Sequence, residues 1–175
     1  MKNIFIGFIL IFLDLNLNFG NSRIGFLPDF IGYMIMITGL VEMANESSFF
    51  MKVKPFATGM AVYTGIIYFM DLFGVTFSLG ILSYVLAFTS TAISLYISYN
   101  IVMGVKDMEQ KYRTLLNGDS LKQTWTLMAV FNVLSYALLV IPLLAIVSII
   151  VAFLVAIGFL VAFNHSKNMY YGTVR

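Results

Sequence analysis

The sequence predicts an all-α polytopic membrane protein, a transmembrane bundle of about six helices forming one domain over residues 1–175. Three observations predict this class. Hydrophobic residues make up 61% of the chain and charged residues 10%, whereas average globular domains are about half apolar and about a quarter charged. The apolar residues gather in runs close to the length of about 20 residues that crosses a bilayer. The basic residues fall on alternate connections between these runs.

Six apolar segments are candidate transmembrane helices. Their approximate ranges are 3–19, 27–44, 55–74, 77–104, 121–141 and 143–164. Pro28, Pro55 and Pro142 lie near the predicted first turns of three segments, where a missing N–H costs nothing. We interpret the N-terminal segment as a retained helix and not a signal peptide, because no small-residue cleavage site follows it.

The distribution of Lys and Arg predicts that both termini lie in the cytoplasm. An inside N-terminus places nine of the ten basic residues on the cytoplasmic side, and only Arg23 outside. Cytoplasmic loops of membrane proteins carry an excess of Lys and Arg. Because five spans would break this alternation, the count favours six.

The first segment changes its pattern halfway. After its apolar run, polar and apolar residues alternate from Leu13 to Phe19. A helix would direct Asp14 and Asn16 to nearly opposite faces, so one face would offer polar groups to lipid. The sequence therefore leaves three arrangements open. The helix is continuous and surrounded by protein, it unwinds near Asp14 beside protein or a cavity, or its end rises into the outer headgroup region. Helices broken in the second way form substrate sites in transporters.

Acidic residues in the predicted outer half suggest a binding site. Three carboxylates map there with one basic residue, which leaves a surplus of two negative charges. Ionisable groups at membrane depth are costly and are usually paired or functional. We predict a ligand-binding site for a small solute, a cation or protons. Its members are Asp14, Asn16, Asn18, Arg23, Asp29, Tyr33 and Asp71. For Asp29 the alternative is a capping role at the start of the second helix.

The spacing of apolar residues predicts that the fourth segment continues as a helix past the membrane to about residue 116. Apolar residues recur there at helical steps, and two acidic–basic pairs have the i,i+4 spacing of ion pairs. The alternative function is therefore a non-catalytic scaffold or subunit that docks a protein partner through residues 105–120. Residues 46–54 are expected to lie at the interface, with Phe49, Phe50 and Met51 in lipid.

A stripe of small residues follows the fourth segment at three- and four-residue steps. Its members are Ser83, Ala87, Ser90, Ser94 and Ser98. The stripe predicts either close helix packing or a polar pathway along that face. On the third segment, Ala61 and Gly65 form a small-xxx-small pair that allows close helix contact.

Composition excludes several function classes. The chain has no cysteine, which rules out disulfides and cysteine-bound metals, and a single histidine, His165. Its formal charge of +2 gives no argument for nucleic acid. No metalloprotease, nucleophile-elbow or phosphate-loop motif occurs. We therefore expect no catalysis, metal or other cofactor, and membrane lipid as a partner.

Residues 25–33, with the sequence GFLPDFIGY, follow the polar end of the first segment. This arrangement resembles a small family of uncharacterised multi-pass membrane proteins of Gram-positive bacteria, over about the first third of the chain. The resemblance implies a bacterial cell membrane, with Asp14, Pro28, Asp29 and Gly32 matching the family pattern. Six helices in a chain of this size also resemble the substrate-binding subunits of energy-coupling-factor vitamin transporters and the cell-shape protein MreD.

Overall fold

The computed structural model describes residues 1–12, 16–19, 22–25, 28–73, 81–138 and 141–173. These residues form six helices and one β-hairpin, and the predicted all-α class with six helices is confirmed. The elements are α1 (Lys2–Phe12), β1 (Asn16–Phe19), β2 (Ser22–Gly25), α2 (Asp29–Glu42), α3 (Ser48–Leu72), α4 (Ile81–Tyr112), α5 (Gly118–Ala137) and α6 (Pro142–Thr173). Among the described residues, stretches of α4 and α6 are long and apolar enough to cross a membrane.

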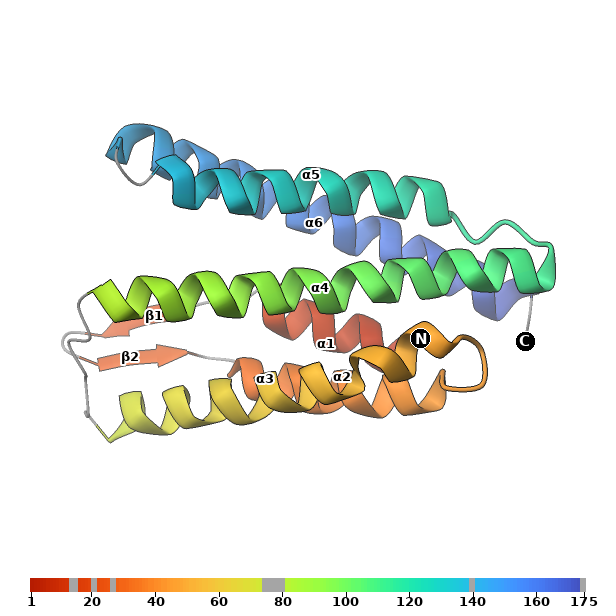
Figure 1. Cartoon of the computed structure of the whole chain (residues 1–175), viewed down its shortest axis with the longest axis horizontal. Helices are drawn as coiled ribbons and strands as arrows, with labels where there is room; N and C mark the ends of the chain where they lie inside the picture. The colour runs from red at the N-terminus through yellow and green to blue at the C-terminus, as the bar shows by residue number, and fades with distance from the viewer. Residues whose placement is uncertain (13–15, 20–21, 26–27, 74–80, 139–140, 174–175) are drawn as a thin grey trace.

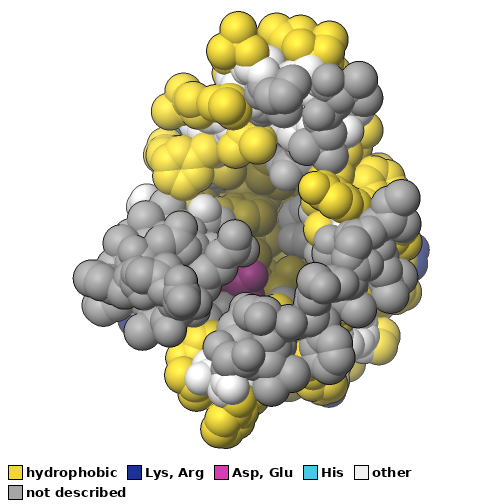
Figure 2. All heavy atoms as spheres, turned by 90° about the vertical axis from the view of Figure 1, so that its left-hand side faces the viewer, with side chains coloured by type: hydrophobic (Ala, Val, Ile, Leu, Met, Phe, Trp, Pro, Cys, Tyr) yellow, Lys and Arg dark blue, Asp and Glu magenta, His cyan; other side chains and the backbone are white. Residues whose placement is uncertain are grey.

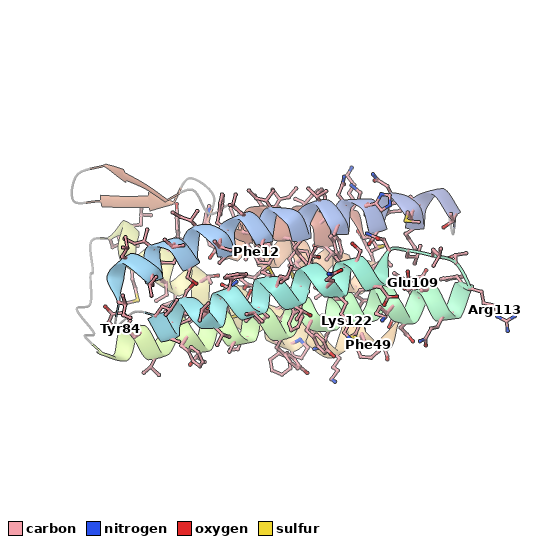
Figure 3. All side chains as sticks on the ribbon, turned by 90° about the horizontal axis from the view of Figure 1, so that it is seen from above. Phe12, Phe49, Tyr84, Glu109, Arg113 and Lys122 are labelled. Atoms are coloured by element: carbon pink, nitrogen blue, oxygen red, sulfur yellow. The ribbon has the colours of Figure 1, made fainter. Side chains whose placement is uncertain are left out.

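The six helices form a closed ring. Each helix packs against its neighbours in sequence, and α1 packs against α6 (Figure 1). Both termini lie at one end of the ring, which we call the terminus end, and the β-hairpin lies at the other, the hairpin end. Tyr84 marks the hairpin end in Figure 3, and Glu109 and Arg113 mark the terminus end. The Met1 ammonium donates a hydrogen bond to the Tyr171 hydroxyl at 3.4 Å, so the first and last helices meet at the terminus end.

Helices α1 and α2 stop about halfway along the ring. They contain 11 and 14 residues, which correspond to about 16 and 21 Å of helix. The 32 residues of α4 and of α6 correspond to about 48 Å. Helices α1 and α2 do not extend to the hairpin end, where the longer helices and the β-hairpin lie (Figure 1).

The predicted first helix, 3–19, is wrong in its second half. The helix ends at Phe12, and Asn16–Phe19 is a strand that pairs antiparallel with Ser22–Gly25. The alternation of apolar and polar residues that begins at Leu13 has a period of two, which is the period of a strand. The two residues between the strands, Gly20 and Asn21, are of types that favour tight hairpin turns. Strand β2 contacts α3.

Glycines let α1 and α2 approach backbone to backbone. A Cβ at Gly7 would lie 2.8 Å from the carbonyl oxygen of Gly32, and a Cβ at Gly39 would lie 2.6 Å from the backbone nitrogen of Ile4. Gly32 and Gly39 are about two turns apart and share one face of α2. The contact predicted at Gly65 is looser, because a Cβ there would lie 3.6 Å from the nearest side chain.

The buried apolar core fills the terminus half of the ring. Its fully buried large side chains include Ile4, Phe8, Met36, Leu40, Phe50, Ile97, Ile101, Met108, Phe159 and Phe163. Phe8 of α1 meets Phe159 and Phe163 of α6 edge to face, with ring centroids 5.3 Å apart in both pairs. This aromatic cluster closes the ring between its first and last helices.

Helix α3 begins at Ser48, earlier than predicted, so Pro55 lies inside it. Phe50, which we expected in lipid, is fully buried. A Cβ at Gly104 of α4 would lie 2.8 Å from the Phe50 ring. The expectation fails at Phe50 because Gly104 leaves a space on α4 that the aromatic ring fills, whereas Met51 is 40% exposed.

The end of α4 also differs from its prediction. The helix ends at Tyr112, and its carboxylates bind the neighbouring connections in place of the predicted i,i+4 partners. Asp107 accepts a hydrogen bond from Ser47 Oγ at 2.6 Å. Glu109 accepts hydrogen bonds from the backbone N–H of Leu116 at 2.7 Å and of Gly118 at 2.9 Å, which caps the first turn of α5.

Glu46 joins three elements at the terminus end. Its carboxylate accepts hydrogen bonds from the hydroxyls of Tyr112 on α4 at 2.5 Å and Tyr170 on α6 at 3.1 Å, and the Lys111 ammonium lies 3.7 Å away. Burial alone would raise the pKa of Glu46, but the two hydrogen bonds and the Lys111 charge outweigh it and hold the pKa below the ordinary 4.5. The α2–α3 connection is thereby bound to α4 and α6.

Replacing Gly39 with Ala is expected to lower the thermal unfolding midpoint of the purified protein. The new methyl group would meet the backbone of Ile4, and overpacking of this kind costs about 1–3 kcal/mol, more than the helix propensity of about 1 kcal/mol that Ala gains over Gly. Gly158→Ala on α6 is the control, because a Cβ there meets nothing within 4 Å. Its midpoint should stay unchanged or rise. Equal midpoints for the two variants would contradict the tight α1–α2 contact.

The Glu46 cluster predicts a pH-dependent stability difference. Because the pKa of Glu46 is lowered in the folded protein, its contribution is complete above the unfolded value of 4.5 and is lost as the pH falls through the folded value. Tyr170→Phe should therefore cost about 1 kcal/mol at pH 7 and less at a pH below the lowered pKa of Glu46, where the carboxylate is protonated. Thermal melts at both pH values measure this, with Tyr84→Phe as the control. A cost independent of pH would exclude the carboxylate as the partner of Tyr170.

Candidate functional site

A cavity of about 500 Å³ lies within the ring where α1 and α2 end. Ile11 and Phe12 from the last turn of α1 and Asp29 from the first turn of α2 line it, and the four long helices supply its other walls. Figure 2 looks into the hairpin end and shows a hollow between the helices with an acidic side chain inside. The cavity exists because the two short helices leave the hairpin half of the ring unfilled.

The wall of the cavity is rich in oxygen. Its polar lining residues are Asp29, Tyr33, Thr64, Ser90, Thr91, Ser94, Asn132, Ser135 and Tyr136. Asp29 is the charged residue in the lining, and the other polar residues carry hydroxyl or amide groups. Apolar side chains, among them Leu95 and Phe153, cover the remainder.

Several of these polar groups direct their hydrogens into their own helices. Thr64 Oγ1 donates to a backbone carbonyl at 2.8 Å, Ser90 Oγ at 2.9 Å and Asn132 Nδ2 at 2.8 Å. A hydroxyl has one hydrogen and two lone pairs, and an amide oxygen has two lone pairs. These groups can therefore still accept hydrogen bonds, so the cavity is complementary to a ligand that donates them.

Hydroxyl contacts connect the helices around the cavity. The Thr91 and Tyr136 oxygens are 2.8 Å apart and join α4 to α5. Ser135 Oγ donates to Ser148 Oγ at 3.1 Å and joins α5 to α6. The long helices around the cavity are therefore connected to one another before any ligand binds.

Two of the predicted site residues meet in this cavity. Asp29 and Tyr33 lie about one turn apart on α2 and both line it. Tyr33 is 2% exposed, and its side chain interacts with Ser94 across the ring and with the charge of Asp29. The structure thus places Ser94 of α4 beside the two site residues that the sequence predicted.

Four of the other predicted site residues lie toward the hairpin end. Asn18 and Arg23 are opposite each other in the hairpin, which also contains Asn16. Asp71 is in the last turn of α3, the helix that β2 contacts. The side chains of these four residues, and all of Asp14, lie outside the described part of the chain.

Sequence reasoning missed the hydroxyl groups that α3 and α5 contribute to the cavity, although the serine stripe on α4 pointed toward it. Ser90 and Ser94 line the cavity. Ser98, one turn further, is fully buried and accepts a hydrogen bond from Trp125 Nε1 at 2.9 Å. Ser90 and Ser94 of the stripe are therefore polar lining, and Ser98 takes part in helix packing.

The chain itself covers part of the predicted docking region, 105–120. Val105 and Met108 are fully buried, whereas Leu115 is 80% exposed. The Lys106 ammonium lies 2.6 Å from the Asp119 carboxylate and holds the pKa of that carboxyl below its ordinary value. The end of α4 is thus bound to the first turn of α5.

Other chemistry in the described residues lies away from the cavity. No three His, Asp or Glu side chains come together within them as a metal site would require. His165 is exposed on the last part of α6, toward the terminus end. The chain matches no known protein family, and neither a curated protein nor a solved structure matches it.

Proposed function

We propose that this protein is a multi-pass protein of a bacterial plasma membrane that binds or transports a small organic cation. Both termini would lie in the cytoplasm, and the cavity would open to the outside. Two helices long and apolar enough to cross a membrane support this assignment. Both termini lie at one end of the ring, as an even number of spans requires. Nine of the ten basic residues lie, in sequence, at or near the helix ends that form this end, which fits the positive-inside rule.

The outer surface of the ring is also suited to lipid. Large apolar side chains are exposed along α3 and α6, with Val62 60%, Leu143 72%, Leu154 60% and Val161 65% exposed. Water-soluble monomers rarely expose contiguous apolar surface on this scale. Hydrocarbon around these helices would cover it.

The observation that carries the binding proposal is a carboxylate in an acceptor-rich cavity at the end of a half-length helix. Ionisable groups at membrane depth are usually paired or functional, and helices that end there border substrate sites in transporters. The first turn of α2 stabilises the charged form of Asp29 through the helix dipole. A cavity of about 500 Å³ falls in the range of about 300–1,000 Å³ for small-molecule sites and exceeds the space that a bare ion needs.

These features favour an ammonium group with further N–H or O–H donors as the recognised chemistry. Asp29 would bind the charge, and the hydroxyls of α3 and α4 would accept the remaining hydrogen bonds. The scaffold alternative has less support, because Val105 and Met108 in region 105–120 are buried by the chain itself. We propose binding without catalysis, since the lining offers a carboxylate and hydroxyls but not the single histidine.

The orientation and the opening of the cavity can be tested with single cysteines, because the chain contains none. A membrane-impermeant maleimide added to intact cells should label Ser94→Cys, which lines the cavity, and leave the fully buried Ser98→Cys unlabelled. Ser120→Cys, at the exposed start of α5, should react only after permeabilisation. Labelling of Ser120→Cys in intact cells would show that the protein has the opposite orientation in the membrane. Equal labelling of Ser94→Cys and Ser98→Cys would contradict the proposal that the cavity opens to the outside.

Binding can be tested by thermal stabilisation of the purified protein in a maltoside detergent. Ethanolamine and choline should raise the unfolding midpoint, whereas ethylene glycol and glycolate should not. The apparent affinity for these two cations, taken from the concentration dependence of the midpoint, should be about tenfold or more weaker in Asp29→Asn. This corresponds to the loss of one charge-assisted hydrogen bond. Asp119→Asn, at the terminus end, is the matched control and should respond as wild type does. Stabilisation that Asp29→Asn retains in full would refute the proposed site.

A further inference from the structure

An apolar groove lies on the other side of one wall of the cavity. It has a volume of about 470 Å³ and runs between α3 and α4. Its lining includes Pro55, Phe56, Gly59, Tyr63, Leu86 and Ile93. Phe56 is 44% exposed, so the groove faces outward from the ring.

The groove and the cavity meet at the α3–α4 seam. Met60 and Ser90 line both of them. Met60 is buried, and its unbranched side chain has three rotatable bonds that let it adapt to a neighbour. The polar cavity and the apolar groove are therefore adjacent, and Met60 and Ser90 lie between them.

Gly59 gives the groove its depth. A Cβ at this position would meet nothing within 4 Å, so the groove extends to the backbone of α3. A linear hydrocarbon chain can lie along such a channel, whereas a small polar solute gains nothing from it. The Thr89 hydroxyl in the groove wall donates its hydrogen to its own helix at 2.8 Å, and most of the other lining residues are apolar.

We propose that the ligand is an amphiphile whose ammonium headgroup binds at Asp29 and whose hydrocarbon chain lies in the α3–α4 groove. This inference rests on the proposed function and narrows its ligand class. Two observations carry it: the charge complementarity between the acceptor-rich cavity and a cationic head, and the adjacency of the cavity and the groove, which share Met60 and Ser90 in their linings. The bilayer would deliver the chain to the groove from the side.

A second apolar groove on α3 provides an internal comparison. Phe30, Val62, Gly65 and Phe69 line it, and it shares no lining residue with the cavity. Lipid chains would fill both grooves by hydrophobic contact alone. Only the groove next to the cavity should distinguish chains by their headgroup.

The test uses hexadecylamine with a photoreactive diazirine midway along its chain, and the matching hexadecanol probe. Each is irradiated with the full-length protein in maltoside micelles, and labelled peptides are mapped by mass spectrometry. The amine probe should label segments 55–63 and 86–93 more strongly than the alcohol probe does, and an excess of ethanolamine should reduce this labelling. Asp29→Asn should bring the amine signal down to that of the alcohol.

Two glycine variants of the same helix separate the groove from general lipid contact. Gly59→Leu fills the groove and should remove the amine-specific labelling, whereas Gly65→Leu fills the comparison groove and should leave it intact. Each variant should first show the same thermal unfolding midpoint as the wild type without ligand. If the larger side chain disturbs folding, Gly59→Ala replaces Gly59→Leu. The proposal of an amphiphilic ligand would be wrong if the amine and alcohol probes labelled the groove equally. It would also be wrong if Gly59→Leu left the amine-specific labelling unchanged.

The two proposals fail in different ways. Ethanolamine could stabilise the protein through Asp29 while the amine probe shows no preference for the groove. In that case the cavity binds a short solute, and the proposal of an amphiphilic ligand is wrong. If neither ethanolamine nor the amine probe depends on Asp29, the proposed function is wrong as well.

Discussion

The close contact between α1 and α2 is the constraint on which the rest of the structure depends. Isolated helices of 11 and 14 residues are marginal on their own, so this pair needs tertiary packing. Gly7, Gly32 and Gly39 provide it by letting the two backbones meet without intervening side chains. The pair then packs against α3 on one side and α6 on the other, which closes the ring. Because the pair ends halfway, closing the ring in one half leaves a cavity in the other.

The carboxylates divide into two groups with different roles. At the terminus end, those of Glu46, Asp107 and Glu109 accept hydrogen bonds from tyrosines, a serine or backbone N–H groups, and they hold connections against helix ends. Asp29 lies instead on the wall of a cavity that is open at the hairpin end. The first group joins the elements of the terminus end. Asp29 and the acceptors around it line the proposed binding site, for which we propose a cationic ligand.

Some of this arrangement could be predicted from the sequence and some could not. The number of helices follows from the length of each apolar run, which is a local property. The hairpin was missed although its signal was present, because the alternation through residues 13–19 was interpreted as a continuous helix, a broken helix or a helix end in the headgroup region, and not as a strand. The early start of α3 was missed because Pro55 resembles a first-turn proline, whereas Phe50 finds its packing partner at Gly104, more than fifty residues away. Asp29 and Tyr33 were identified as a pair because they are one turn apart on one helix, and long-range partners such as Ser94 were not.

The sequence by itself determined that the chain forms six helices rich in apolar residues, and it predicted a membrane as their surroundings. These properties depend on composition and on local periodicity. Only the tertiary structure decided which polar residues share a cavity, because Asp29, Thr64, Ser90 and Asn132 come from four helices that ring closure brings together. It also decided that an apolar groove adjoins this cavity, since the seam at Met60 and Ser90 forms only when α3 packs against α4. Contacts of this kind join residues far apart in the chain, and no local pattern specifies them.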